Sequence, residues 1–142
     1  MHAQILTRET ALVMENKSIL VVDDEPFILR SILYVLKREG FETFSATDGV
    51  EALQLLQEVK PRLMFLDVMM PRMNGYEVCT AVKNDPRLKD IYVIMLTAKG
   101  QEQDRIRGLA AGADEYLTKP FSPAHLVQQA RQALETMEPH NV

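Results

Sequence analysis

The sequence predicts an α/β protein built on a doubly wound, five-stranded parallel sheet. Two kinds of segment alternate along its 142 residues: short runs rich in apolar, β-branched and aromatic residues, and longer segments with the apolar spacing of amphipathic helices. Three of the short runs are almost continuously apolar, as expected of parallel strands buried on both faces. Strict alternation with short connections and right-handed crossovers then favours one sheet flanked by five helices.

The predicted strands are residues 18–22, 41–45, 63–66, 91–96 and 115–117. The runs 18–22, 63–66 and 91–96 are the nearly continuous apolar ones. The run 41–45 mixes polar and apolar residues, so we expect it at an edge of the sheet.

Five amphipathic helices are predicted between and after these strands. The first ends before Gly40 and carries one apolar stripe, formed by Phe27, Ile28, Ser31, Ile32, Val35 and Leu36. The second spans 49–59, the third lies around 76–82, and the fourth spans about 101–111 and ends at Gly112. The fifth starts after Ser122 and Pro123, an N-cap and first-turn pair, and continues to Met137.

Composition and charge exclude several classes of protein. Hydrophobic residues make up 46% of the chain and charged residues 25%, which is typical of a globular domain. No apolar run approaches the roughly 20 residues of a membrane-spanning helix, and no signal-peptide pattern opens the chain. The net charge of −4, without a basic block, argues against direct nucleic-acid binding. The single cysteine, Cys79, is expected to be a core or spectator residue rather than a reactive thiol. A lone cysteine cannot form an internal disulfide, which suits the reducing cytoplasm.

One domain is expected over residues 18–138. Residues 1–17 precede the first strand and form either a short amphipathic helix, through Ile5, Leu6, Leu12 and Val13, or a frayed tail. Residues 139–142 are a tail. Because so little follows the fifth helix, we expect no effector domain within this chain.

Polar residues stand where the predicted strands end. Asp23 and Asp24 follow the first strand, Asp67 the third and Thr97 the fourth, and Lys119 comes just after the fifth. Because the carboxyl ends of parallel strands meet at one edge of a sheet, these side chains should lie together. Three carboxylates there repel one another unless a cation binds, and oxygen ligands with room for water favour Mg²⁺ over Ca²⁺. A carboxylate nucleophile, a metal, a hydroxyl and an ammonium together predict phosphoryl transfer.

Each of these residues also has a structural interpretation. Taken alone, Asp24 and Thr97 would more often cap a following helix, and Lys119 before Pro120 would be a solvated loop charge. An isolated Asp67 is harder to explain, because an acid after the apolar run 63–66 sits where burial is costly. The conjunction favours a functional site, since four strands each supply an apt polar group at the same edge.

Four stretches make the sequence resemble the response regulator receiver family over about residues 17–137. They are ILVVDDEP at 19–26, LDVMMPRMNG at 66–75, LTA at 96–98 and GADEYLTKPF at 112–121, and the second is the most specific. The resemblance implies a flavodoxin-like fold with strand order 2-1-3-4-5. It also implies a phosphoryl-accepting switch of two-component or phosphorelay signalling rather than a turnover enzyme.

The resemblance further implies roles for single residues. Asp67 would be the phosphoacceptor, supplied by a sensor histidine kinase or a histidine phosphotransfer protein. Magnesium would be bound by Asp24 directly, by Asp23 mainly through water, by Asp67, and by the backbone carbonyl of Met69. The acyl phosphate would contact Thr97, its neighbour Ala98, and Lys119. Tyr116 would turn to report phosphorylation to an output protein or domain, and the Lys119–Pro120 bond would be cis.

The C-terminal third resembles the receivers of winged-helix transcription factors. Those receivers dimerise through charged residues on the fourth helix, the fifth strand and the fifth helix. The charges of Arg105, Asp114, Glu115 and Arg131 fit that pattern. His125 and Gln129 stand where an acid and a base are expected, and without complementary partners the symmetric dimer is disfavoured.

Two other classes of function compete with the switch. Phosphohydrolases with an aspartyl nucleophile usually carry a second acid two residues later, and here that position is Met69. A scaffold that binds partners without phosphorylation would not need Asp23, Asp24, Asp67, Thr97 and Lys119 together. Both alternatives are therefore disfavoured.

Overall fold

A computed structural model of the chain describes residues 17–98 and 102–137. Five parallel strands form one sheet in the order β2-β1-β3-β4-β5, as expected, with β2 at an edge. They are β1 (Ser18–Val22), β2 (Glu42–Ala46), β3 (Leu63–Asp67), β4 (Tyr92–Ala98) and β5 (Glu115–Lys119). The predictions for residues 1–16, for Gln101 and for residues 138–142 lie outside the described residues.

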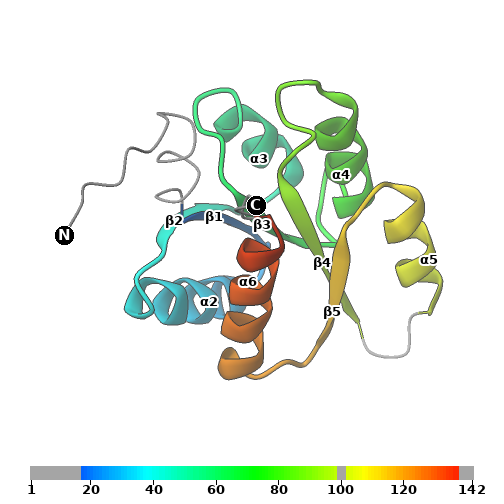
Figure 1. Cartoon of the computed structure of the whole chain (residues 1–142). Helices are drawn as coiled ribbons and strands as arrows, with labels where there is room; N and C mark the ends of the chain where they lie inside the picture. Colours follow the sequence, from blue (N-terminus) through cyan, green and yellow to red (C-terminus); the bar gives the residue numbers. More distant parts are fainter. Residues whose placement is uncertain (1–16, 99–101, 138–142) are drawn as a thin grey trace, which may run out of the picture.

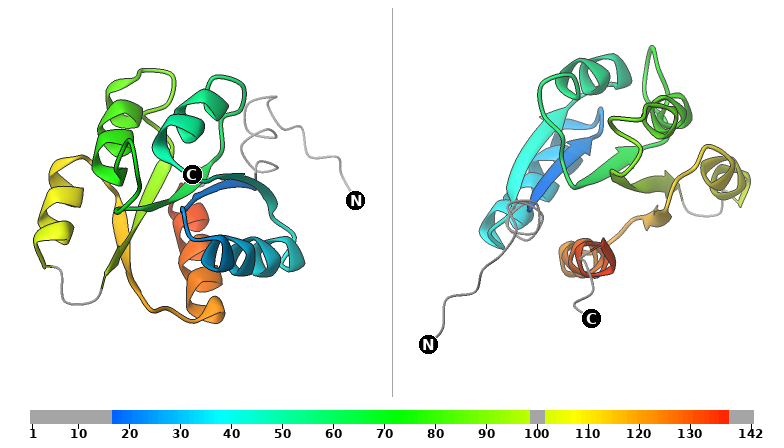
Figure 2. Two further views of the ribbon diagram at one scale, coloured as in Figure 1. Left: turned by 180° about the vertical axis from the view of Figure 1, so that it is seen from behind. Right: turned by 45° about the horizontal axis from the view of Figure 1, so that its top comes forward.

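Five helices cover the two faces of the sheet. They are α2 (Pro26–Arg38), α3 (Gly49–Leu55), α4 (Gly75–Asn84), α5 (Glu102–Ala110) and α6 (Pro123–Met137). Figures 1 and 2 show α2 and α6 together on one face, and α3, α4 and α5 on the other. Within the described ranges, no helix has the length and apolar character needed to cross a membrane.

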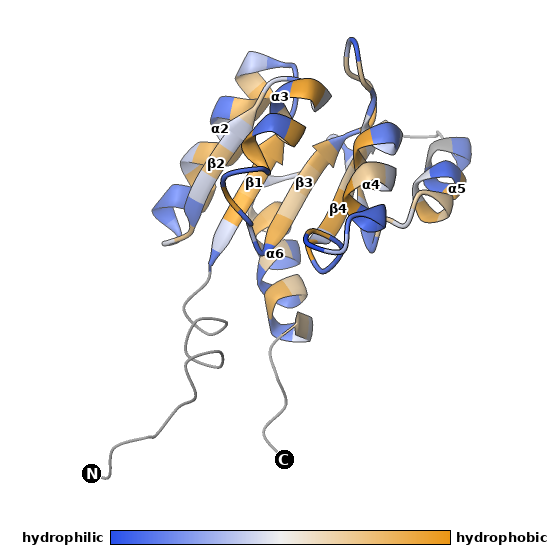
Figure 3. Cartoon of the chain, turned by 90° about the horizontal axis from the view of Figure 1, so that it is seen from above, coloured by the Kyte–Doolittle hydropathy of each residue, from blue (hydrophilic) through white to orange (hydrophobic). Residues whose placement is uncertain are grey.

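The core has two layers, one on each side of the sheet. Successive residues of a strand point to opposite faces, so Ile19 and Val21 pack with α2 and α6 while Leu20 and Val22 pack with α3 and α4. Figure 3 shows the result as apolar strands lined by helices whose outer faces are hydrophilic. Burial on both faces explains why the central strands read as continuous apolar runs.

Two predictions about helices were wrong. The second helix ends at Leu55, before Val59, because the N–H groups of Gln57 and Glu58 bond carbonyls three residues back, closing a turn. In α2 the buried residues are Leu29, Ile32, Val35 and Leu36, whereas Phe27 is 80% exposed. A step of two residues turns the side-chain direction by about 200° around an α-helix. Phe27 therefore points away from the side on which Leu29 is buried.

The predicted stop signals of the first and fourth helices, the cap of the fifth helix and the burial of the cysteine are confirmed. Gly40 and Gly112 have φ angles of 92° and 97°, the left-handed conformation that ends a helix at low steric cost. The Oγ atom of Ser122 accepts the N–H of His125 at 3.0 Å and so caps α6. Cys79 is fully buried on α4, and its thiol lies 3.5 Å from the carbonyl oxygen of Ala111.

Candidate functional site

The predicted polar residues meet at the carboxyl edge of the sheet. Asp23 and Asp24 directly follow β1, and Asp67 is the last residue of β3, the strand beside it. One carboxylate oxygen from each of the three lies within 4.8 Å of the others. Lys119 ends β5, and its Nζ donates to Asp23 Oδ2 at 3.0 Å and to Asp67 Oδ1 at 3.3 Å.

The carboxylates differ in burial, and they outnumber the cation that faces them. Asp23 is 0% exposed and Asp67 is 5% exposed, while Asp24 is exposed to solvent. Glu25 joins the group, because its Oε1 lies 3.4 Å from Lys119 Nζ. We did not predict Glu25, although its place directly after Asp23 and Asp24 was a usable signal. Three acids thus contact one ammonium group, and Asp24 adds a fourth carboxylate to the cluster.

Burial and like charge perturb the nucleophile candidate. Burial first, and then the charge of Asp23, raise the pKa of Asp67 to about 7, although the ammonium group of Lys119 opposes both. Burial also works to lower the pKa of Lys119, but the charge of Asp67 and the hydrogen bond to Asp23 outweigh it and raise that pKa. A carboxyl group whose pKa is raised to near 7 within a cluster of acids is typical of a functional site.

The structural interpretations of single residues do not hold here. The N-cap residue of α2 is Glu25 rather than Asp24, and it makes no side-chain capping bond. Thr97 is buried inside β4, five residues before α5 begins, so it does not cap that helix. Lys119 is bonded to two buried acids rather than solvated. The Lys119–Pro120 peptide bond is cis, as the resemblance implied.

The remaining candidates lie on β4, on β5 and in the loop after β3. Ala98 is the exposed last residue of β4. Tyr116 lies half-buried on β5, and the guanidinium carbon of Arg105 sits 5.0 Å from the centre of its ring. The Met69 side chain is 72% exposed, which leaves only its backbone as a candidate ligand group.

The connection between β3 and α4 is folded tightly against the site. The N–H of Gly75 donates to the carbonyl of Val68 at 2.9 Å and closes the loop that contains Met69. A Cβ atom on Gly75 would lie 2.3 Å from the carbonyl oxygen of Asp67, so only glycine fits there. Asn74 and Glu77 form a capping box at the start of α4. The local sequence thus fixes the backbone next to Asp67.

The donor set suits one hard divalent cation. Three carboxylate oxygens converge, and nitrogen and sulfur ligands do not contribute to the cluster that the described residues form. Oxygen-only sites with few protein ligands and open access favour Mg²⁺, which keeps several waters. Exposure of Asp24 leaves the cluster open on one side. Such an ion would also relieve the repulsion among the acids.

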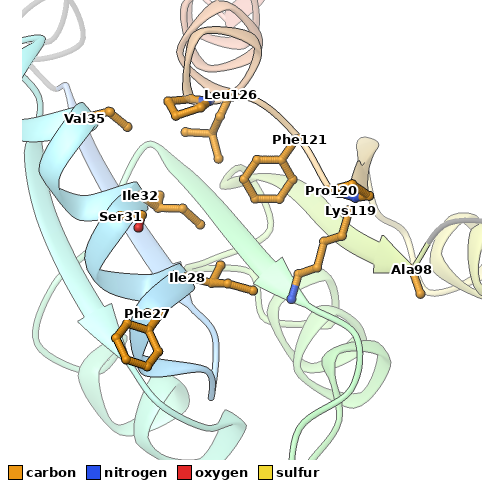
Figure 4. Close-up of a pocket in the computed structure, with 11 residues that line it drawn as sticks. Phe27, Ile28, Ser31, Ile32, Val35, Ala98, Lys119, Pro120, Phe121 and Leu126 are labelled. Carbon is orange, nitrogen blue, oxygen red and sulfur yellow. The ribbon is translucent and has the colours of Figure 1, made fainter.

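An apolar pocket adjoins the cluster, and sequence reasoning missed it. It has a volume of about 440 Å³ and lies between α2 and the segment that joins β5 to α6 (Figure 4). Phe27 and Ile28 line it from α2, Phe121 and Leu126 line it from the other side, and Lys119 borders it. Phe27 could have indicated this pocket, but it was predicted to lie on the apolar stripe of the helix rather than at an exposed position.

Comparison with known proteins places these features in one family. Residues 19–131 match the family described as the response regulator receiver domain. The chain is 44% identical over 123 residues to the alkaline phosphatase synthesis transcriptional regulatory protein PhoP of Bacillus subtilis, covering 87% of this chain and 50% of that protein. It is 42% identical over 123 residues to the phosphate regulon transcriptional regulatory protein PhoB of Escherichia coli, covering 87% and 54%.

Solved structures agree with this comparison. The signal receiver domain of a signal transduction histidine kinase from Syntrophus aciditrophicus superposes with a TM-score of 0.82 at 33% identity, covering 88% of this chain and 95% of that one. The chain spans about half the length of the curated relatives it matches.

Proposed function

This chain belongs to the response regulator receiver domain family of two-component signalling, and from that membership we propose that it is a cytoplasmic switch phosphorylated on Asp67. The phosphoryl donor is a phosphohistidine of a sensor histidine kinase or a histidine phosphotransfer protein. The observation that carries the proposal is the buried Asp67 carboxylate, which contacts Lys119 and shares an acidic cluster with Asp23 and Asp24.

The residues of the cluster divide the work of phosphoryl transfer. An Asp67 oxygen attacks phosphorus while the bond from phosphorus to the histidine nitrogen breaks, so the phosphoryl group moves and the imidazole leaves. Asp23, Asp24, Asp67 and the Met69 carbonyl hold Mg²⁺, which when bound neutralises charge on the phosphoryl oxygens. Lys119 pairs with one phosphoryl oxygen, and the Thr97 hydroxyl and the Ala98 backbone bond the others.

Lys119 also prepares the nucleophile. Only the ionised carboxylate attacks, and the pKa of Asp67 is raised to about 7 by burial and by Asp23. The Lys119 ammonium group lowers that pKa and thus raises the ionised fraction at neutral pH. A hydrolase would need a further acid to promote turnover, and Met69 occupies the expected position, so the phosphorylated state persists as a signal.

The test is to incubate the chain with acetyl phosphate and Mg²⁺ and to follow intact mass and free phosphate. A switch gains one phosphoryl group, a hydrolase releases phosphate continuously, and a scaffold does neither. Asp67→Asn should abolish the gain, because the amide has nearly the same shape but is not nucleophilic. Full labelling of that variant by a phosphohistidine donor would overturn the assignment.

We further infer that the phosphohistidine donor protein docks on the apolar pocket beside Lys119. A donor must bring its histidine to Asp67, and the pocket offers an apolar surface that borders Lys119. Phe27 is 80% exposed there, as an aromatic anchor of an interface would be.

Two classes of donor test this docking surface. Phe27→Ala should slow transfer from a phosphohistidine donor by about tenfold, in line with the loss of one interface anchor. Labelling by acetyl phosphate should not change, because a small molecule needs no docking surface. Tyr34→Ala is the matched control, since Tyr34 is also exposed on α2 but does not line the pocket. Equal slowing with both donors would contradict the docking role.

The switch itself is proposed to connect Thr97 with Tyr116. Phosphate on Asp67 draws the Thr97 hydroxyl inward, and the Tyr116 ring turns into the vacated space and leaves Arg105. Beryllofluoride with Mg²⁺, which mimics the aspartyl phosphate, should then shift the amide resonances of α5 and β5. In Thr97→Ala the shifts should remain near Asp67 and disappear from α5. Wild-type shifts confined to the surroundings of Asp67 would exclude this route.

A further inference from the structure

An ion pair outside the acidic cluster connects two loops that lie beside that cluster, the one after β2 and the one after β3. Asp48 follows β2 and therefore reaches the same carboxyl edge of the sheet as Asp67. Its Oδ2 accepts a hydrogen bond from Nη2 of Arg72, which lies in the loop between β3 and α4. That loop also contains Met69, the proposed backbone ligand of Mg²⁺.

Asp48 is held rigidly and carries its charge. Its Oδ1 accepts the N–H of Glu51 at 2.8 Å and caps α3, so one carboxylate serves both the helix and the arginine. The side chain is only 9% exposed. The bond from the Glu51 N–H, followed by the bond from Arg72, keeps the pKa of Asp48 below its ordinary value. The pair is therefore ionic at neutral pH.

Arg72 sits at a strained point of the loop. Its φ is 67°, the only positive value at a non-glycine residue among those the structure describes. The N–H of Met73 donates to the carbonyl of Pro71 at 2.7 Å, so Arg72 is the centre of a γ-turn of the rarer, strained hand. Such a conformation persists only where surrounding contacts hold it. The bond to Asp48 is a contact that does so.

The backbone on both sides of Arg72 is packed closely enough to pass this restraint on. A Cβ atom on Gly49 would lie 2.7 Å from the Met73 carbonyl oxygen, so the loop lies directly against the start of α3. At its two ends, the bond from Gly75 N–H to the Val68 carbonyl closes the loop. The segment that includes Met69 is thus fixed at Arg72 and at its base.

We propose that Asp48 and Arg72 are positioning residues for magnesium, whose ion pair holds the β3–α4 loop in the conformation that presents the Met69 carbonyl to the acidic cluster. The inference rests on the proposed magnesium-dependent phosphorylation of Asp67. Neither residue touches the reacting atoms. Groups that orient metal ligands commonly change metal affinity by one to two orders of magnitude when they are lost.

Two substitutions separate positioning from simple stability. Arg72→Gly removes the guanidinium group and also relieves the positive φ, so the folded state should lose no stability. Asp48→Asn keeps the α3 cap, because asparagine is an equally good N-cap residue, and removes only the charge. In each variant of the full chain the Kd for Mg²⁺, measured by calorimetry, should rise about tenfold.

Further variants provide the controls. Arg72→Lys keeps the charge and should restore most of the affinity. The double variant Asp48→Asn with Arg72→Gly should bind Mg²⁺ no more weakly than either single variant, since both remove the same interaction. Lys60→Gln removes one exposed positive charge elsewhere and should leave the Kd unchanged. Amide hydrogen exchange in residues 69–73 should quicken in Arg72→Gly without a fall in melting temperature.

An unchanged Kd in Arg72→Gly would overturn the proposal, as would additive losses in the double variant. The titration uses the unphosphorylated protein and does not depend on which residue accepts phosphate. Labelling of Asp67→Asn would therefore disprove the phosphoacceptor assignment while the titration still decided the role of Asp48 and Arg72.

Discussion

A lysine side chain lies at each end of the sheet, and the two ammonium groups have different balances of charge around them. At the amino end, Lys83 Nζ donates to Asp114 Oδ2 at 2.7 Å and to the carbonyls of Ile91 and Lys89 at 2.8 and 3.2 Å. An ammonium group has three donors, so Lys83 is fully satisfied. At the carboxyl end, Lys119 is shared among Asp23, Glu25 and Asp67.

The difference separates what folding requires from what function requires. The amino end pairs one cation with one anion, and Asp114 Oδ2 also accepts the N–H of Val93 at 2.8 Å. The carboxyl end keeps an excess of negative charge that a structural site would have neutralised. Burial, and then the charge of Asp23, raise the pKa of Asp67 there to about 7. A site that keeps buried negative charge without enough cations to neutralise it is expected to serve function rather than stability.

The largest effect is expected from removing the buried nucleophile. The folded-state pKa of Asp67 is about 7 against an ordinary value of 3.8, so the folded protein binds this proton more tightly than the unfolded chain does. The free energy of unfolding therefore falls as the pH rises from about 4 to about 7, by on the order of 3 kcal/mol. In Asp67→Asn this fall should be absent. Urea unfolding in EDTA at several pH values measures both profiles, and parallel profiles would contradict the raised pKa.

A smaller loss is expected at the amino end. Lys83→Met leaves Asp114 without its cation and two carbonyls without their donor, which should lower the free energy of unfolding by about 2 kcal/mol. Lys89→Met, at an exposed neighbouring position, is the control and should change stability by less than about 0.5 kcal/mol. Phosphorylation by acetyl phosphate should survive in Lys83→Met. Equal losses in the two variants would remove the contrast between the ends.

The smallest effect has the opposite sign. Asp24→Ala relieves repulsion among the acids, so without Mg²⁺ the variant should be more stable by about 0.5 kcal/mol. The same change should weaken Mg²⁺ binding, because the ion loses a charged oxygen ligand. Urea unfolding with and without Mg²⁺ measures both changes. Unaltered Mg²⁺ stabilisation would place the metal site elsewhere.

Prediction from sequence succeeded where one simple rule applied. Apolar runs identified the strands, and the rule that parallel strand ends meet at one edge predicted that Asp23, Asp67 and Lys119 lie together, as they do. It failed where the partner of a residue depends on side-chain direction. The predicted apolar stripe of α2 included Phe27, but this residue is 80% exposed and lines a pocket, because a helix with apolar residues around its circumference allows several stripes.

Side-chain pairs between segments far apart in the sequence also could not be predicted. Asp48 stands after β2 at the same edge as the predicted cluster, yet its partner Arg72 is 24 residues away, in a loop with an unusual backbone. Lys83 and Asp114 are likewise separated by 31 residues. Periodicity and strand order place elements, but they do not specify which loop side chains face each other.

The burial of the single cysteine gives the protein a built-in reporter of its own opening. Cys79 is fully buried, and burial raises its thiol pKa to about 11, so a thiol reagent meets neither an accessible nor an ionised sulfur in the closed state. Modification then proceeds only through transient openings of α4, and its rate reports their free energy. Ligands that bind the native state suppress such openings. Alkylation kinetics can therefore follow the occupancy of the acidic cluster without any added label.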